Sequence, residues 1–112
     1  ETPMKEIRAI VRPQRLPQLR EALRQIPNFP GLTFTKAEGF TAPANVVKRT
    51  VKDELTDYSP KIMVTVIADD AMVPIIRQAI IDASSTGQIG DGIVWTLDLD
   101  SLHRIRNGES ML

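Results

Sequence analysis

The chain contains no cysteine, few aromatic residues and no excess charge of either sign. Without cysteine, its 112 residues offer no disulfide, no thiol nucleophile and no zinc–thiolate site. Because 14 basic residues balance 14 acidic ones, nothing draws the whole chain toward nucleic acid or an anionic membrane surface. Any recognition of charge must therefore come from a local arrangement of side chains.

Aromatic residues and long apolar runs are scarce as well. One Trp, one Tyr and three Phe are present, and the first and third predicted strands hold none of them. A sheet that binds RNA stacks bases on strand aromatics, so no nucleic-acid partner is expected. No apolar run approaches the roughly 20 residues of a membrane span and no signal peptide is recognisable, so we expect a cytoplasmic protein. Residues 1–3 are expected to be a remnant that precedes the domain.

Alternating and helical patterns of apolar residues predict six elements. Period-two alternation predicts strands, and a spacing of three and four residues predicts helices. The predicted strands cover residues 5–12, 31–40, 61–68 and 93–99, and the predicted helices cover residues 16–26 and 72–83. The order strand, helix, strand, strand, helix, strand is that of a ferredoxin-like α+β domain. Two helices cover one face of such a sheet, so the other face, if apolar, requires another subunit.

Residues at both ends of the second helix are expected to cap it. Asp69 and Asp70 precede this helix, at the end where the helix dipole favours negative charge. Gly87 follows it and fits a C-terminal cap.

A long segment, residues 41–60, joins the second and third strands, where a hairpin would need about two to five residues. Loops of this length in compact domains are usually functional or mobile. The basic and acidic residues of the segment cancel. It therefore fits either an arm that contacts a partner or a solvated insertion.

Side chains suited to catalysis are sparse. His103 is the only histidine, and a lone histidine near a strand end is more often a surface or packing residue than a base. Ser84, Ser85 and Thr86 supply hydroxyls without a recognisable histidine–carboxylate pair. We therefore predict that the protein is not an enzyme and has no catalytic residue, no metal site and no prosthetic group.

Two short segments carry the remaining signal. The three glycines of "TGQIGDG", residues 86–92, fit either a helix end followed by a turn or a nest of backbone N–H groups for an anion. In "RIRNGE", residues 104–109, Arg104 and Arg106 are two apart, so in an extended segment they point the same way and can clamp a phosphate. An ordinary basic surface strand is the alternative for this second segment.

Together these segments resemble the PII signalling proteins. "KEIRAIVRP" near the start, "PK" at Pro60 and Lys61, "TGQIGDG" and "RIRNGE" occur in the same order and at nearly the same spacing as in that family. The resemblance covers residues 4–109 and implies one ferredoxin-like domain that assembles as a homotrimer. It also implies that an adenine nucleotide (ADP, AMP or ATP) binds as a regulatory ligand between subunits. Residues 41–60 would then contact the target, a membrane transporter or a metabolic enzyme.

The resemblance also assigns site residues. Residues 87–92 would wrap the phosphates, Arg104 and Arg106 would reach in from the neighbouring chain, and Lys61 would lie near the phosphates and any second ligand. The base pocket would be lined by Ile10, Thr33, Gly39 and Ile67. The nucleotide-binding residues implied in this way are Ile10, Thr33, Gly39, Lys61, Ile67, Gly87, Gln88, Ile89, Gly90, Asp91, Gly92, Arg104 and Arg106.

Three positions depart from the pattern of the family's nitrogen sensors. In those proteins the long loop opens with a glutamine that helps to hold magnesium and 2-oxoglutarate, and it carries a tyrosine that is nucleotidylated. Here Pro43 stands near the glutamine position, Tyr58 lies near the loop's exit, and Ile93 replaces a phosphate-binding lysine. We therefore predict that ADP or AMP binds at least as tightly as ATP and that 2-oxoglutarate adds nothing. The loop is more similar to divergent PII-like proteins linked to bicarbonate uptake or metal efflux, which makes bicarbonate a candidate second ligand.

Two other classes of protein use the same fold. An acylphosphatase-like hydrolase would need an asparagine and an arginine that converge on phosphate, and Asn45 and Arg49 are available in the long loop. An amino-acid-binding regulatory domain would bind no nucleotide. Phosphate release from an acyl phosphate would identify the first, and calorimetry with ADP would separate the second from a PII-like protein.

Overall fold

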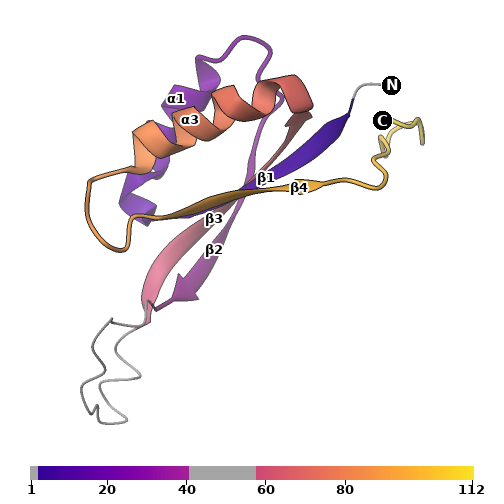
Figure 1. The fold of residues 1–112 in the computed structure, drawn as a ribbon. Helices are drawn as coiled ribbons and strands as arrows, with labels where there is room; N and C mark the ends of the chain where they lie inside the picture. Colours follow the sequence, from indigo (N-terminus) through magenta and orange to yellow (C-terminus); the bar gives the residue numbers. More distant parts are fainter. Residues whose placement is uncertain (1–2, 41–57) are drawn as a thin grey trace.

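The computed structural model describes residues 3–40 and 58–112, which form one sheet with two helices packed on one of its faces (Figure 1). The predictions for Pro43, Asn45 and Arg49 concern residues outside this described part. In chain order the elements are β1 (Met4–Val11), η1 (Pro13–Arg15), α1 (Leu16–Arg24), β2 (Thr33–Gly39), β3 (Ser59–Asp69), η2 (Asp70–Met72), α3 (Val73–Ser84) and β4 (Gly92–Asp98).

The strands pair antiparallel in the order β2-β3-β1-β4, which confirms the predicted ferredoxin-like arrangement. β3 begins at Ser59, earlier than predicted, because Ser59 and Pro60 pair with Gly39 and Glu38 of β2. The prediction of a loop over residues 41–60 is therefore wrong at its end, since the last two of these residues belong to the sheet.

The core fills the space between the helices and the sheet. Leu19 and Leu23 of α1 and Ile76 of α3 are completely buried against alternate residues of β1 and β3. Burying a side chain of this size stabilises the fold by about 1.5–3 kcal/mol. The apolar residues that form this core are Ile7, Ala9, Val11, Leu19, Leu23, Ile62, Val64, Val66, Ala68, Val73, Ile76 and Ile80.

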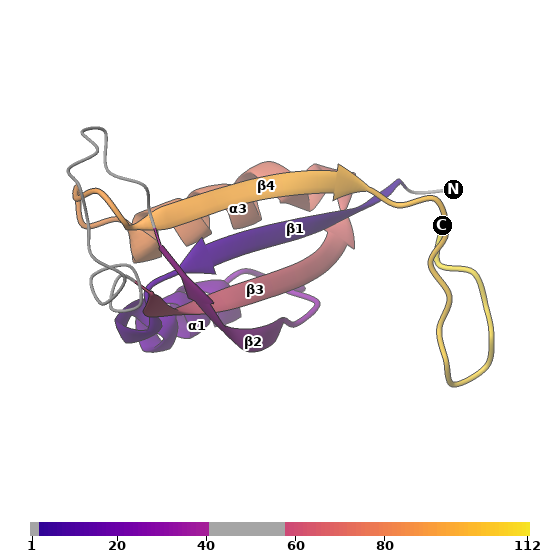
Figure 2. The same ribbon diagram turned by 90° about the horizontal axis from the view of Figure 1, so that it is seen from below.

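No described helix covers the opposite face of the sheet, which Figure 2 shows from its open side. Glu6, Arg8 and Ile10 of β1 are the residues of the central strand that alternate with its buried ones. Each is flanked by one residue of β3 and one of β4, in the three rows Met63–Ile10–Ile93, Thr65–Arg8–Trp95 and Ile67–Glu6–Leu97. Ile10 and five of the six flanking residues, all but Thr65, are large and apolar, so this open face is mostly apolar.

A salt bridge lies in the middle of the open face. The Nε atom of Arg8 donates a hydrogen bond of 2.7 Å to Oε1 of Glu6, and the Glu6 side chain is only 16% exposed. The pair neutralises two charges within this mostly apolar region.

The ends of α3 differ from the expected caps. α3 ends at Ser84, and the N–H of the extended residue Ser85 bonds to the Ile81 carbonyl at 2.9 Å, so Gly87 is not its cap. At the other end, the 3-10 turn η2 leads into α3 and neither Asp69 nor Met72 makes a side-chain capping bond. Pro74 in the first turn of α3 has no N–H, which leaves one donor fewer to cap. The backbone N–H of Asp70 donates a hydrogen bond of 2.9 Å to the carbonyl of Pro3, which fixes the start of η2.

Candidate functional site

The glycine segment, residues 86–92, is organised around one carboxylate. It connects α3 to β4, and Asp91 lies near its end. The Asp91 carboxylate accepts hydrogen bonds from the backbone N–H of Thr86 at 2.7 Å and of Gln88 at 3.2 Å, and from the Thr86 hydroxyl. Hydrogen bonds from Thr86, above all, hold the pKa of Asp91 well below its usual range. The segment is therefore a closed turn with an ionised side chain inside it.

Arg12, at the end of β1, joins the glycine segment to the sheet. Its Nε donates to Asp91 at 3.3 Å and its Nη2 donates to the Ile89 carbonyl at 3.0 Å. Arg12 is not among the residues predicted for the site. The motif "KEIRAIVRP" contains it, but its partners lie 77 and 79 residues further along the chain. No local pattern links residues so far apart.

The three glycines of the segment are required for different reasons. All three have positive φ angles, of 78° at Gly87, 96° at Gly90 and 117° at Gly92. A Cβ at Gly92 would lie 1.7 Å from the carbonyl oxygen of Ile10, whereas a Cβ at Gly87 would have nothing within 4 Å. At Gly90 a Cβ would meet the Arg12 guanidinium at 3.0 Å. The bare backbone at Gly92 thus permits the pairing of β4 with β1, which is a structural requirement of the turn itself.

One hollow brings together several of the predicted site residues. Its volume is about 400 Å³, and it lies between the start of β4, the end of β2 and the start of β3. Lys61 is half-buried here and supplies the hollow's cationic side chain. The residues that line it are Ile10, Gly39, Phe40, Lys61, Gly90, Gly92 and Ile93.

Thr33 and Ile67 lie apart from that hollow. They line a second one, of about 300 Å³, with Pro30, Gly31 and neighbouring residues. In the sheet, Ile10 is paired with Met63, and Ile67 lies four residues further along β3, or about 13 Å. A single subunit therefore contains two separate parts of the predicted base pocket.

Arg104 and Arg106 do not lie in an extended segment, so that prediction is wrong. Residues 105–107 form a turn in which the N–H of Gly108 bonds to the Arg104 carbonyl at 2.7 Å. The N–H of Arg104 bonds in turn to the Glu109 carbonyl at 2.9 Å. Gly108, with a φ of 72°, lets the chain fold back in this way. Both arginines are exposed, and they follow the end of β4 opposite to the glycine segment (Figures 1 and 2).

Comparison with known proteins identifies the family. A family model described as nitrogen regulatory protein P-II matches residues 4–109. The chain belongs to the P-II family. Nitrogen regulatory protein P-II of Azospirillum brasilense is 35% identical to it over 107 residues, which are 95% of each chain. Nitrogen regulatory protein P-II 1 of Escherichia coli K12 is 34% identical over the same share of each chain. The solved structure of Arabidopsis thaliana PII bound to citrate matches with a TM-score of 0.77 and 26% identity, covering 98% of this chain and 87% of that one.

The resemblance drawn from the short motifs of the sequence is thus confirmed, and this P-II chain is a regulatory protein of that family. Three of the four motifs mark regions near the ends of β4: the glycine segment, the root of the long loop and the turn that holds Arg104.

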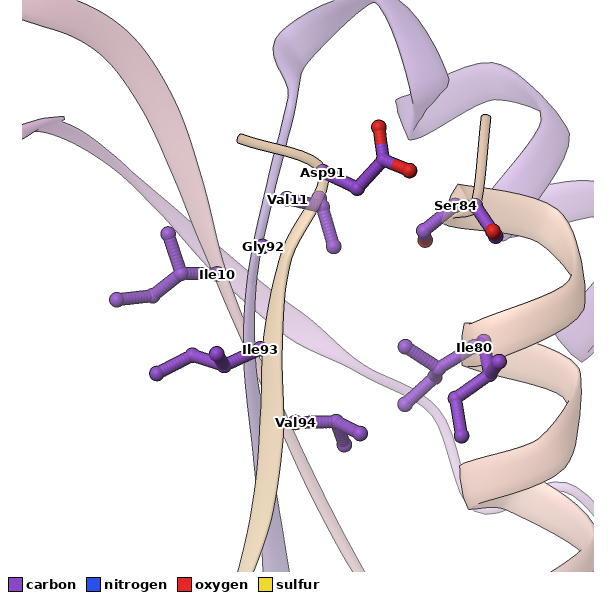
Figure 3. A pocket seen from close by; sticks show the side chains of 10 residues that line it. Ile10, Val11, Ile80, Ser84, Asp91, Gly92, Ile93 and Val94 are labelled. Carbon is purple, nitrogen blue, oxygen red and sulfur yellow. The ribbon is translucent and has the colours of Figure 1, made fainter. Parts of the chain in front are cut away.

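A further cavity of this P-II chain lies between the end of α3 and the start of β4 (Figure 3). Its volume is about 170 Å³, and Ile80 and Val94 supply apolar walls. In Figure 3 the side chains of Ile10 and Ile93 point away from α3, toward the open face of the sheet. Ser84 is 94% buried, and its hydroxyl has no hydrogen-bond partner among the described residues.

Within residues 3–40 and 58–112, no group of His, Asp and Glu side chains is arranged to hold a metal ion. His103 is exposed and forms an isolated bridge with Ser110 that closes the turn around Arg104. None of the helices in that part of the chain is long and apolar enough to cross a membrane.

Proposed function

We propose that this P-II chain is a cytoplasmic, homotrimeric regulator that binds an adenine nucleotide between its subunits and is not an enzyme. The observation that carries the proposal is the position of the cationic and amide donors. The glycine segment and the Arg104 turn lie at opposite ends of β4 within one subunit. A phosphate chain can contact both only where one subunit's glycine segment meets another subunit's arginine turn.

The two hollows support the same geometry. One holds Ile10, Gly39 and Lys61 beside the glycine segment, and the other holds Thr33 and Ile67. If a neighbouring subunit places its second hollow against the first, the two parts form one cleft with apolar walls for a base. The mostly apolar open face of the sheet offers the surface that such an assembly would bury.

The side chains around the phosphates favour a short phosphate chain. Arg104 and Arg106 can each make charge-assisted bonds worth about 1.5–3 kcal/mol. Ile93 is 65% exposed beside the glycine segment and offers no donor where a lysine would hold a further phosphate. A third phosphate would lose water without a dedicated partner. ADP or AMP should therefore bind at least as tightly as ATP.

The long loop and the residues at its root would contact the regulated target and bind the second ligand. Phe40 and Tyr58 close its root, with ring centroids 5.0 Å apart in an edge-to-face contact. Lys61 lies directly beside this root and can pair with a small anion. The Arabidopsis relative is described as bound to citrate, also a small anion. We propose that bicarbonate is the anion here and that the loop signals nutrient state, in carbon or nitrogen assimilation, to a transporter or an enzyme.

Titration calorimetry tests the proposal. We expect ADP to bind the wild type, magnesium-ATP to bind no more tightly, and 2-oxoglutarate to leave both affinities unchanged. Arg104→Gln should weaken ADP by about tenfold or more. Arg24→Gln is the matched control, because Arg24 is exposed at the end of α1, whereas the opposite end of α1, next to Arg15, is the one near the end of α3. A magnesium-dependent preference for ATP that 2-oxoglutarate strengthens would contradict the proposal.

A further inference from the structure

The Asp91 carboxylate is saturated by donors from its own chain. Its Oδ2 accepts from the N–H groups of Thr86 and Gln88, and its Oδ1 accepts from the Thr86 hydroxyl and from Arg12. These donors come from the start and the middle of the glycine segment and from the end of β1. The Asp91 carboxylate thus links the start and the middle of the glycine segment to the end of β1.

Asp91 cannot itself be a ligand of a phosphate. An ionised carboxylate only accepts hydrogen bonds, and so does a phosphate oxygen above its pKa, so the two cannot bond directly. The backbone N–H groups of Thr86 and Gln88 are already used by Asp91. Among the described residues, the backbone N–H groups of Gly87, Ile89 and Gly90 have no acceptor in the turn, so they are the donors left to meet an anion.

The glycine segment needs such a tie to keep its shape. Gly87, Gly90 and Gly92 give it three residues of high conformational freedom within a short stretch. A flexible loop loses affinity because the ligand must order it, and a loop held in its binding shape avoids that cost. Bonds to an ionised carboxylate are the strong kind of hydrogen bond, which suits a side chain that must hold a turn together.

We infer that Asp91 is a positioning residue for phosphate recognition: its carboxylate holds the glycine segment in the shape that presents the remaining amides to a phosphate, and it contacts no ligand atom. The inference rests on the proposed nucleotide binding. It gives the Asp91 side chain a role within the expected nucleotide-binding segment, and it adds Arg12, which donates to the same carboxylate and to the Ile89 carbonyl.

A comparison of ADP with adenosine tests the inference, because only ADP has phosphates. We expect Asp91→Ala to weaken ADP by about tenfold or more and to change adenosine by less than about twofold. Asp91→Asn should restore part of the loss, because its amide oxygen can still accept from Thr86 and Gln88. Asp82→Ala is the matched control, because Asp82 is exposed on α3 and its carboxylate accepts a hydrogen bond from Gln78 on the same helix. Calorimetry measures the ADP affinities, and NMR titration measures the weaker binding of adenosine.

Amide hydrogen exchange without any ligand provides the second measurement. The N–H groups of Thr86 and Gln88 should exchange several times faster in Asp91→Ala than in the wild type, and the amides of β1 should not change. Unchanged exchange at Thr86 and Gln88 would overturn the inference, as would ADP binding that is equal or tighter in Asp91→Ala. Equal loss of ADP and adenosine would show a general structural role and would overturn it too. Failure of the wild type to bind ADP, with exchange as expected, would instead contradict the proposed function.

Discussion

At the scale of single residues, the two outer glycines of the glycine segment should respond very differently to a methyl group. Gly92→Ala places its Cβ on the Ile10 carbonyl of the central strand, so we expect a loss of several kcal/mol or no folding. Gly87→Ala has free space and suffers only from its positive φ, which costs about 1–2 kcal/mol. Urea denaturation of both variants measures the difference. Equal, small effects would show that β4 can shift away from β1 at Gly92.

The ionisation of Asp91 makes a prediction about acid stability. Its pKa in the folded protein lies below the ordinary value of 3.8, so the unfolded chain binds more protons at acidic pH. The stabilisation by the carboxylate is complete above about pH 5 and decreases as the pH falls below about 4. The free energy of unfolding of the wild type should therefore exceed that of Asp91→Asn at neutral pH, and the gap should narrow toward pH 2.5. A gap independent of pH would mean that the charge of Asp91 contributes nothing.

At the scale of elements, Arg15 connects the start of α1 to the end of α3. Its Nε donates to the carbonyl of Ala83 at 2.9 Å, and this carbonyl belongs to the last turn of α3, where acceptors lack helical partners. Arg15→Gln should lower the free energy of unfolding by about 1 kcal/mol. Arg20→Gln, an exposed substitution within α1, should change it by less than half of that. Thermal denaturation of the two variants checks this, and equal melting temperatures would show that the last turn of α3 needs no cap.

The elements themselves were predictable from the sequence because their signals are local. Leu16, Leu19 and Leu23 repeat at the spacing of one helix face, and the alternation in β1 and β3 separates their buried residues from the open face. The caps of α3 were not predictable in the same way. Gly87 has the residue type of a cap, but its φ is set by the bonds of Asp91 to Thr86 and Gln88. The contacts of Arg12 with Asp91 and Ile89 were not predictable either, because they depend on the packing of distant parts of the chain.

At the scale of the whole molecule, the open face of the sheet predicts self-association. Met63 lies on this face beside Ile10, so a glutamate at this position would place a charge in the surface that an assembly buries, where losing its water is costly. We expect light scattering to give the mass of a trimer for the wild type and a smaller mass, or aggregation, for Met63→Glu. Ile75→Glu is the control, because Ile75 is a 56% exposed apolar residue on α3. A wild type that is monomeric at micromolar concentration would remove the cleft on which the proposed site depends.

The candidate site was only partly predictable at this scale. The glycine segment and Lys61 were recognised from short motifs, and the structure places them around one hollow. The shape of the Arg104 turn was not, because a spacing of two residues says nothing about a backbone that folds back at Gly108. The separation of Ile10 from Ile67 follows from strand register, which the sequence alone does not specify.

The open face also carries a spectroscopic reporter. Trp95 is the only tryptophan of the sequence, it is half-buried on this face, and its register partner in β1 is the cation Arg8. The emission wavelength of an indole follows the polarity around it, so covering the face would move Trp95 fluorescence to the blue and shield it from soluble quenchers. Association of the subunits, and any change of that interface when a ligand enters, could then be followed by light emitted from the native chain, without a label.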